Sequence, residues 1–531
     1  MTGTRPARAG WVWAYAFAAL IVPLIGWYEL LEPFGRDQGI HATIAFGLND
    51  GLTTYRDVFN MKPPLTTGVH WLSQALFGHS MMAIRALDLL FATLTALALV
   101  GLGRALRLGR AFGVAAAFGW AVLYYSYGFW AHAQTDGWAG MLVVPALLLM
   151  ALGWARAGTA RLALMAGAGA VMGLAFALKY TIGGVGILVF APLLAGWIGR
   201  DGERFRFSDF VAVTLGGLAV LVVIGGAMAA AGAWAPFVEI QDFIRGYVAY
   251  APDDAPGLLA EVALIGMPST YLVLLALSGL AGAIAIWRGE GRALPLVIGG
   301  LWVGAGWVSG HVQGKGFPYH YLPMVPAYAY LIGIALAWLT GLLPRTGQRR
   351  AALALAMLAL FLPSQAARTD AVALAALRTS DPAATFAGLV RKGSDFDVEA
   401  NLEFAEILKA RRKPGDGLFV WGYGTMLYFL AGEPPRYRYP YSWPFLLDYY
   451  DGRYTADLLE RLRADPPDQF VVQVDDATPW VTYNERDSEE MLAAFPALEA
   501  FLSDNYDLVE TRPRFKLYEL REDRAGAAPG P

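Results

Sequence analysis

The chain has 531 residues, of which 56% are hydrophobic and 16% are charged, and its formal net charge at pH 7 is −3. Soluble domains carry about 25% charged residues, so this composition, with a mean hydropathy of +0.42, predicts an integral membrane protein. The chain contains no cysteine, which excludes a disulfide framework and any metal site built on cysteine.

Apolar runs of membrane-spanning length recur along the first two thirds of the chain. A helix needs about 20 apolar residues to cross roughly 30 Å of hydrocarbon, and continuous runs exclude a closed barrel, whose strands alternate. The first run follows Arg5 and Arg8 as a signal peptide would, but its length and the Glu32 and Pro33 after it favour an uncleaved anchor. We expect about eleven transmembrane helices, near residues 11–31, 81–103, 111–127, 137–155, 162–178, 181–198, 210–232, 262–287, 294–310, 320–342 and 350–363.

Basic residues follow every even-numbered run and predict the topology. Positive charge marks cytoplasmic loops, so we expect the N-terminus and these loops in the cytoplasm. The basic residues are Arg104, Arg107, Arg110, Arg156, Arg161, Arg200, Arg204, Arg206, Arg288, Arg292, Arg345, Arg349 and Arg350. The opposite loops are poorer in arginine and carry Asp37, Asp136, Asp242, Asp253 and Asp254. An odd number of spans then places residues 364–531 outside the cytoplasm.

The composition divides the chain into a membrane domain, residues 1–363, and a soluble extracytoplasmic domain, residues 364–531, with normal charge density. Short strands are expected at 417–421, 469–474 and 515–520, and helices near 399–411, 454–464 and 487–503. These elements predict a small α/β domain, followed by a disordered tail from Arg524 to Pro531. A dense aromatic cluster between Tyr437 and Tyr450 suits a sugar ring, but packing against the membrane domain is the favoured interpretation.

The segment 32–80 after the first span is too long and too patterned to be a simple connection. Residues 41–52 have amphipathic helical spacing, Pro63 and Pro64 force an extended break, and 65–77 resume helical spacing. We expect helices lying along the outer membrane surface here. The segment 233–260 has a similar pattern.

Two motifs in this segment carry a family resemblance. Residues 35–39 read GRDQG and residues 55–65 read YRDVFNMKPPL, so an acid, arginines and a lysine lie beside a membrane surface. This pattern resembles the first extracytoplasmic loop of the GT-C glycosyltransferases, closest to the branch of the protein O-mannosyltransferases and the lipid A aminoarabinose transferase. The GTMLYFLAGEPPRY sequence at 424–437 also fits the family. The resemblance implies an inverting transferase, active on the outer face of the cytoplasmic membrane, that uses a polyprenyl-phosphate-linked sugar.

Asp37 and Asp136 are the candidate catalytic acids. Attack of an acceptor hydroxyl on the anomeric carbon needs a base, and a carboxylate within hydrogen-bond reach supplies it. The resemblance places Asp37 on the first acidic position of the family and Asp136, in HAQTDGW, on the second. The alternative for both is an N-cap of the following helix. Many relatives follow the first acid with glutamate, whereas this chain has Gln38.

Four cations are candidates for binding the donor phosphate: Lys62, Arg56, Lys179 and Arg245. Lysine is a compact charge suited to a phosphate, although an interfacial lysine can simply snorkel, and Arg56 could instead pair with Asp57. A lysine between two apolar spans is costly unless it faces a cavity or an anion. The candidates for contact with acceptor or donor are Gln38, Tyr55, Tyr180, His320 and Tyr321.

The sequence assigns no metal ligands and no certain cofactor, although Asp37 and Asp136 could share a divalent cation. No P-loop, HExxH motif or long basic tract occurs, which argues against nucleotide hydrolysis, a zinc protease site and nucleic-acid binding. The expected partners are membrane lipid, a polyprenyl-phosphate sugar and a glycan, lipid or protein acceptor. The rival functions are a transporter or flippase of lipid-linked sugars and a non-catalytic envelope scaffold.

Overall fold

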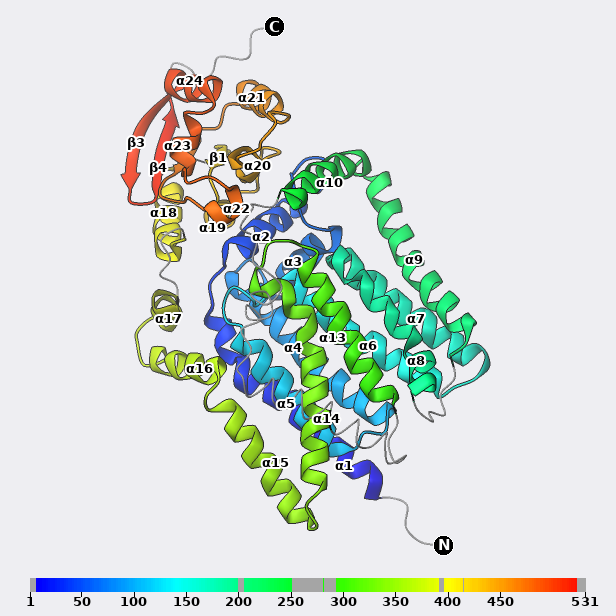
Figure 1. Ribbon diagram of the computed structural model, residues 1–531. Helices are drawn as coiled ribbons and strands as arrows, with labels where there is room; N and C mark the ends of the chain where they lie inside the picture. Colours follow the sequence, from blue (N-terminus) through cyan, green and yellow to red (C-terminus); the bar gives the residue numbers. More distant parts are fainter. Residues whose placement is uncertain are drawn as a thin grey trace.

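The computed structural model describes residues 6–198, 205–250, 280, 293–390, 396–413 and 415–522. Long helices form a bundle, and a smaller domain with a four-stranded sheet lies at one end of it (Figure 1). The chain enters the bundle at the end opposite to the C-terminal domain (Figure 1). This is the predicted architecture, a polytopic helical membrane protein with a C-terminal α/β domain.

Each predicted span within the described residues coincides with a helix or with two consecutive helices. The elements of the bundle and its connections are α1 (Pro6–Gly26), η1 (Trp27–Leu31), α2 (Arg36–Asn49), α3 (Pro64–Phe77), α4 (Met81–Ala105), α5 (Arg110–Ser126), α6 (Thr135–Trp154), α7 (Gly158–Leu178), η2 (Tyr180–Phe190), α8 (Ala191–Ile198), α9 (Phe207–Ala230), α10 (Trp234–Ala249), α13 (Leu294–His311), η3 (Pro318–Met324), α14 (Val325–Gly341) and α15 (Thr346–Phe361).

Seven helical segments among the described residues are long and apolar enough to cross a membrane, against about eleven predicted spans. An eighth is added if α15 and α16 (Gln365–Ala376), which meet at 71°, form one bent span. The predicted span at 262–287 lies outside the described residues. So do Arg5, Arg200, Arg204, Asp253, Asp254, Arg288, Arg292 and the tail from Arg524.

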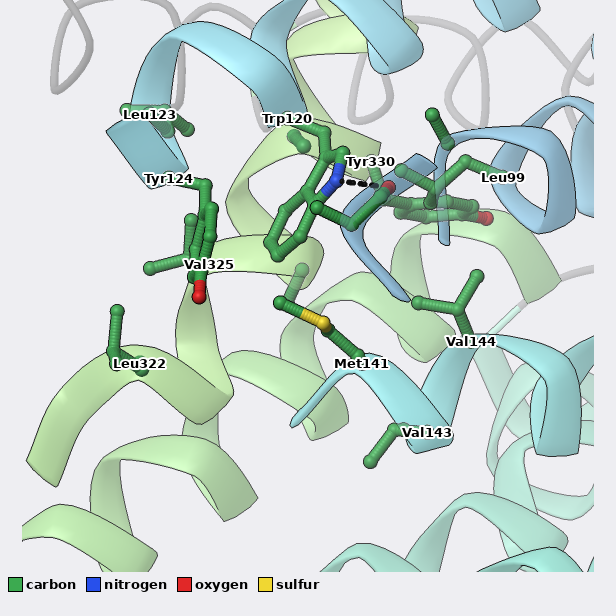
Figure 2. Packing of buried hydrophobic residues seen from close by; sticks show 14 of the residues in the cluster. Leu99, Trp120, Leu123, Tyr124, Met141, Val143, Val144, Leu322, Val325 and Tyr330 are labelled. Carbon is green, nitrogen blue, oxygen red and sulfur yellow. Dashed lines mark hydrogen bonds between the residues drawn. The ribbon is translucent and has the colours of Figure 1, made fainter. Parts of the chain in front are cut away.

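Helix α5 lies at the centre of the bundle, where α1, α4 and α14 contact it. Trp120 on α5 is buried, donates its indole N–H to the Ala92 carbonyl at 2.9 Å, and stacks on Tyr124 with ring centroids 4.9 Å apart (Figure 2). Elsewhere small residues bring helices together: a Cβ at Gly169 on α7 would lie 1.9 Å from the Val213 carbonyl oxygen on α9. Close backbone approach of this kind stabilises helix pairs in lipid.

The C-terminal domain is built on a mixed sheet of order β1-β2-β4-β3, in which β1 and β2 are parallel and the other pairs are antiparallel. The three predicted strands are confirmed, and β3 was missed. The predicted helix at 487–503 is two helices, because the helical conformation is interrupted before Pro496. The elements are α16, α17 (Pro382–Val390), α18 (Val398–Arg411), β1 (Leu418–Trp421), α19 (Met426–Ala431), α20 (Trp443–Leu446), α21 (Thr455–Ala464), β2 (Gln469–Gln473), α22 (Pro479–Thr482), α23 (Ser488–Leu492), α24 (Pro496–Asn505), β3 (Tyr506–Arg512) and β4 (Phe515–Leu520).

Helices α16 and α17 contact η1 of the bundle, and α16 also contacts α1 and α5. These helices therefore pack on the membrane domain, although they follow residue 363 in the chain. The domain boundary at 363/364 stays a prediction.

The segment 32–80 forms the junction between the bundle and the C-terminal domain. Its first helix, α2, is largely buried and packs against the C-terminal domain, and its placement along the membrane surface stays a prediction. A Cβ at Gly39 would lie 2.8 Å from the Met426 Cβ, and the Thr43 hydroxyl donates to the Thr425 carbonyl at 2.9 Å. The amide of Phe59 donates to the Arg438 carbonyl at 2.6 Å. These contacts tie both α2 and the loop that follows it to the C-terminal domain.

Candidate active site

A cavity of about 390 Å³ opens at this junction. Ligand pockets in proteins span about 300–1,000 Å³, so the cavity has the size of a small-molecule site. Charged side chains and aromatic side chains from both the bundle and the C-terminal domain line the cavity. The lining residues are Arg36, Asp37, Ile40, Met61, Lys62, Tyr127, Trp130, Ala131, Gln134, Tyr247, Phe317, Pro318, Tyr319, Tyr423, Tyr441, Trp443, Trp480 and Val481.

Asp37 lies in the first turn of α2 and faces the cavity. Gly35 occupies the N-cap position and no side chain caps this helix end, so Asp37 is not the N-cap that its position in the sequence allowed. Its carboxylate Oδ2 lies 3.7 Å from the Lys62 Nζ, with side chains 27% and 14% exposed respectively. The positive end of the helix dipole favours a carboxylate here. Asp37 is therefore an ordered anion that a ligand in the cavity can reach.

Lys62 is fixed through its backbone. Its amide donates to the Asn60 side-chain oxygen at 3.0 Å, and its carbonyl accepts from the Tyr55 hydroxyl at 2.7 Å. Asn60 is tied in turn to Thr67 on α3 at 3.0 Å. Tyr55 is buried and does not line the cavity, so its contact with the site is indirect. These bonds fix the backbone of Lys62, whose ammonium faces Asp37.

Asp136 lies in the first turn of α6 and is fully buried. Its carboxylate is 3.0 Å from the Lys179 Nζ and accepts a hydrogen bond from Gln313 at 2.9 Å. The N-cap of α6 is Gln134, so Asp136 is not a cap either. Neither Asp136 nor Lys179 lines the cavity. Each candidate acid already faces its own lysine, an arrangement that does not favour one cation shared between Asp37 and Asp136.

The remaining predicted phosphate ligands lie away from the cavity lining. Arg56 pairs with Asp57 at 2.8 Å and donates to the Ala231 carbonyl, with its side chain 47% exposed. Arg245 is 80% exposed and lies 3.6 Å from Asp242 on the same helix. The pairing of Arg56 with Asp57 is the alternative that the sequence left open.

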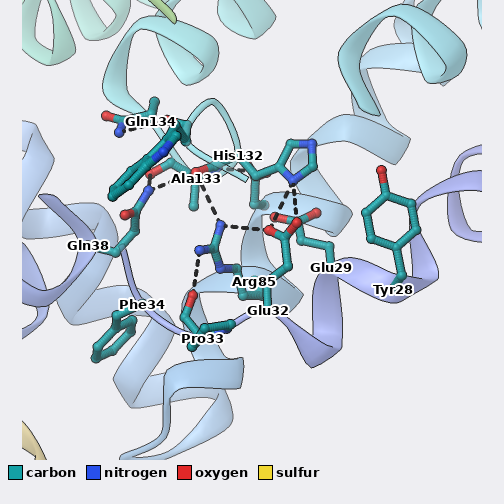
Figure 3. A network of polar contacts seen from close by, with 12 residues as sticks. Tyr28, Glu29, Glu32, Pro33, Phe34, Gln38, Arg85, His132, Ala133 and Gln134 are labelled. Atoms are coloured by element: carbon teal, nitrogen blue, oxygen red, sulfur yellow. Dashed lines mark hydrogen bonds and ion pairs between the residues drawn. The ribbon is translucent and has the colours of Figure 1, made fainter. Parts of the chain in front are cut away.

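The other residues predicted to contact acceptor or donor also lie outside the cavity lining: Gln38, Tyr180, His320 and Tyr321. The Gln38 amide donates to the His132 carbonyl at 2.8 Å, so the side chain turns into the protein (Figure 3). Tyr180 packs against Phe176, and His320 and Tyr321 are buried in η3. These side chains support the walls around the site in this structure.

Arg36, which sequence reasoning missed, and two residues of the aromatic cluster between Tyr437 and Tyr450, for which packing was the favoured interpretation, line the cavity. Arg36 lies with its guanidinium carbon 5.4 Å from the Tyr423 ring centroid and 5.9 Å from that of Trp130. It belongs to the same GRDQG motif as Asp37, which was the available signal. Tyr441 and Trp443 reach the cavity from the C-terminal domain, a contact that only the tertiary fold produces.

Two histidines behind the site are neutral imidazoles. Burial sets the pKa of His41 on α2 and of His70 on α3 well below the ordinary value. The charge of Lys62 lowers the pKa of His41 further. The positive charge that faces the cavity therefore comes from the lysine and the arginine.

Lys315 closes one edge of the site. Its ammonium donates to the carbonyls of Tyr247 and Tyr250, each at 2.9 Å, and to the Tyr483 hydroxyl of the C-terminal domain. Burial lowers the pKa of Lys315 to about 8. The loop that precedes η3, the end of α10 and the C-terminal domain are thus joined by one side chain.

The comparisons with known proteins agree with this architecture. Residues 61–227 match the family described as dolichyl-phosphate-mannose-protein mannosyltransferase. ArnT from Cupriavidus metallidurans, solved bound to undecaprenyl phosphate, superposes with a TM-score of 0.54 over 98% of this chain and 99% of that chain, at 17% identity. The chain has the GT-C fold. The resemblance found in the sequence is thereby confirmed.

The apo state of the same ArnT gives a TM-score of 0.52 over 96% of this chain and 98% of that chain, also at 17% identity. No curated protein matches the sequence. At this level of identity the likeness establishes the GT-C fold, and a multi-pass membrane protein with it. The chemistry has to be argued from the residues of this chain.

Proposed function

We propose that this protein transfers a sugar from a polyprenyl-phosphate-linked donor to an acceptor hydroxyl, with inversion and with Asp37 as the general base. The observation that carries the proposal is the pairing of Asp37 with Lys62, 3.7 Å apart, on the wall of a cavity lined by aromatic rings. A base and a phosphate-binding cation lie side by side. Aromatic faces suit the apolar faces of a sugar ring.

The reaction is a single displacement. The acceptor oxygen forms a bond to the anomeric carbon, its proton passes to the Asp37 carboxylate, and the bond between that carbon and the phosphate oxygen breaks. The polyprenyl phosphate leaves as an anion that needs no proton, so one carboxylate suffices as base. The Lys62 ammonium stabilises the phosphate charge as the bond breaks. One displacement inverts the anomeric centre.

Asp136, at the second acidic position of the family, forms a buried ion pair with Lys179. Their buried ion pair lies close enough for the charge of Lys62 to act on Lys179, so the pair sets the field around the donor phosphate. Arg36 adds a cation on the cavity wall. In this assignment Asp136 is a positioning residue, and Arg56 and Arg245 take no part.

The fold and the topology support a membrane-embedded donor. The ArnT structure with the same fold was solved with undecaprenyl phosphate, and the matched family is described by a dolichyl-phosphate-linked sugar. The arginine-rich loops of the sequence favour a site on the outer face of the cytoplasmic membrane, with the C-terminal domain outside the cytoplasm. The acceptor is a glycan, a lipid or a protein hydroxyl.

The rival functions lack a comparable observation. A flippase or transporter of lipid-linked sugars predicts charged groups at broken helices near the middle of the membrane, whereas Asp37 and Lys62 lie at the junction with the C-terminal domain. A non-catalytic scaffold leaves the paired charges in the cavity without a role.

Native mass spectrometry of copurifying lipids tests the donor site. Wild type should retain a polyprenyl phosphate, with or without its sugar, and Lys62→Ala should lose it. Lys409→Ala is the matched control, because Lys409 is an exposed lysine paired with Glu406 on α18. Failure of wild type to bind the lipid supplied in excess, or equal retention by Lys62→Ala, would contradict the donor site.

A further inference from the structure

A second cluster of polar side chains lies behind the loop that carries Asp37. Glu29 on η1, Glu32 after it and His132 between α5 and α6 are all buried, and their ligand atoms lie within 4.8 Å of one another (Figure 3). The His132 Nδ1 is 3.0 Å from one oxygen of Glu32 and 3.1 Å from the other. His132, which the sequence left as a structural histidine, therefore faces two carboxylates.

The cluster holds more negative than positive charge. Arg85 is fully buried and lies 3.2 Å from Glu32. Asp88 lies beside Glu29 and accepts hydrogen bonds from the Tyr124 hydroxyl at 2.6 Å, the Trp138 indole at 2.6 Å and the Ala133 amide at 3.1 Å, so it is satisfied as an anion. Three buried carboxyl groups thus meet one guanidinium and one histidine, and a buried carboxylate needs a cation or a proton to balance its charge.

Glu29 is one of the side chains of this cluster with a buried atom that lacks a hydrogen-bond partner in the part of the chain that the structure describes, together with Arg85 at Nε and His132 at Nε2. Its Oε2 accepts from the Tyr125 hydroxyl at 3.2 Å, but its Oε1 has no hydrogen-bond donor among the described residues, although the side chain is fully buried. Buried polar atoms without a partner are rare and call for a ligand or a proton. The Glu29 carboxyl also lies within hydrogen-bond reach of Asp88, and two carboxylates can bond to each other only through a shared proton.

We propose that Glu29, Glu32 and His132 bind one divalent cation, and the imidazole and carboxylate set suits Zn²⁺. Zinc binds nitrogen and oxygen ligands at about 2.0–2.2 Å, so donors separated by 3.0 and 3.1 Å can share one ion. One oxygen of Glu29, both oxygens of Glu32 and the His132 Nδ1 supply four donor atoms. The ion replaces the proton between His132 and Glu32 and supplies the missing charge.

The ion is structural rather than catalytic, because its three ligand residues are buried and none of them lines the cavity. The ion would affect the active site by fixing the backbone around His132, which is bonded to residues near Asp37. The His132 carbonyl accepts from Gln38, next to Asp37, and from Arg85 at 3.2 Å. Arg85 also donates to the Pro33 carbonyl at 2.6 Å. The ion therefore fixes the segment that leads into α2.

Metal content and stability test the site without any transfer assay. The full-length protein is purified in detergent on a tag without histidines, and its metal is measured by mass spectrometry. Wild type should hold about one divalent ion per chain, and chelation should lower its midpoint of thermal unfolding. Glu29→Gln should lose most of the ion and the response to chelator. Asp37→Asn and Asp136→Asn are the controls and should keep both, even if they abolish transfer.

The proposal would be overturned if wild type held no stoichiometric metal and its midpoint of thermal unfolding changed with neither Zn²⁺ nor chelator. A proton shared by Glu29 and Asp88 would then balance the charge. Loss of the ion from Asp37→Asn with retention in Glu29→Gln would overturn it too, by moving the ion to the cavity. The measurements on wild type decide the question if Glu29→Gln does not fold.

Discussion

The buried pair of Asp136 and Lys179 gives a prediction that separates structure from catalysis. Lys179→Met removes the ammonium and strands a carboxylate that is fully buried. Its partner Gln313 remains, with one hydrogen bond at 2.9 Å. The single variant should therefore be strongly destabilised. The double variant with Asp136→Asn removes both charges and should recover part of the loss.

The magnitude follows from the geometry. At 3.0 Å and an effective dielectric of 20, the attraction between the two charges is about 5.5 kcal/mol before desolvation is subtracted. Breaking a buried pair by removing one partner costs about 3–5 kcal/mol, whereas replacing both can be neutral. We expect Lys179→Met to lose about 3–5 kcal/mol and the coupling between the two substitutions to be about 0.5–3 kcal/mol.

Equilibrium unfolding in mixed micelles measures all four corners of the cycle. Arg161, buried in an ion pair with Asp209 at 2.8 Å, is the control, because it lies in the first turn of α7, the helix that Lys179 follows. Arg161→Met should lose stability without losing transfer per folded molecule, while Lys179→Met should lose both. Additive free energies for the Asp136 and Lys179 substitutions would refute the pairing.

Three further variants test the packing, the junction and the cavity wall. Gly169→Ala should destabilise the folded protein by about 1–3 kcal/mol, because the added Cβ meets the backbone of α9. Gly226→Ala is the control and should leave stability unchanged, because a Cβ there has nothing within 4 Å. Equal midpoints of thermal unfolding for the two variants would contradict the α7–α9 contact. Burial lowers the pKa of Lys315 from 10.5 to about 8, so between these values the folded state binds fewer protons than the unfolded chain and stability rises with pH. The unfolding midpoint of wild type minus that of Lys315→Met should therefore increase from pH 8 towards pH 10.5, and a flat difference would contradict the burial of the ammonium. Arg36→Lys keeps the charge but loses the planar stacking, so the KM for the lipid donor should rise about 2- to 30-fold; an unchanged KM would remove Arg36 from the donor site.

The local pattern of the sequence was enough to predict the helices of the bundle, although only seven or eight of the described segments are long and apolar enough to span a membrane, and it predicted three of the four strands. It missed β3 because that strand lies at the edge of the sheet and carries charged residues such as Asp507, Glu510 and Arg512. An edge strand with an exposed face has no apolar alternation to recognise. The burial of α2 was missed because its cover, the C-terminal domain, comes some 380 residues later in the chain.

The candidate site was predictable where its residues share one segment. Asp37 and Lys62 lie in the same segment 32–80, and the structure places both on the cavity wall. Arg36 belongs to that segment too but was not singled out. The contact of Asp136 with Gln313, which follows α13, and the contact of Glu32 with His132 join residues 177 and 100 positions apart. Periodicity and spacing carry no information on such pairs, so His132 looked like a lone histidine in the sequence.

Turnover by Asp37→Asn is the most direct test of the proposed function. The substrate is a synthetic polyprenyl-phosphate sugar in detergent with a hydroxyl acceptor, and the readout is release of the polyprenyl phosphate together with the anomeric configuration of the product. Wild type should turn the donor over with inversion, and Asp37→Asn, confirmed as folded and lipid-bound, should lose about 10²–10⁴-fold in kcat, the usual contribution of a general base. Near-wild-type turnover by Asp37→Asn would contradict the assignment of the base, and no turnover by wild type with any donor of this class would contradict the proposed function itself.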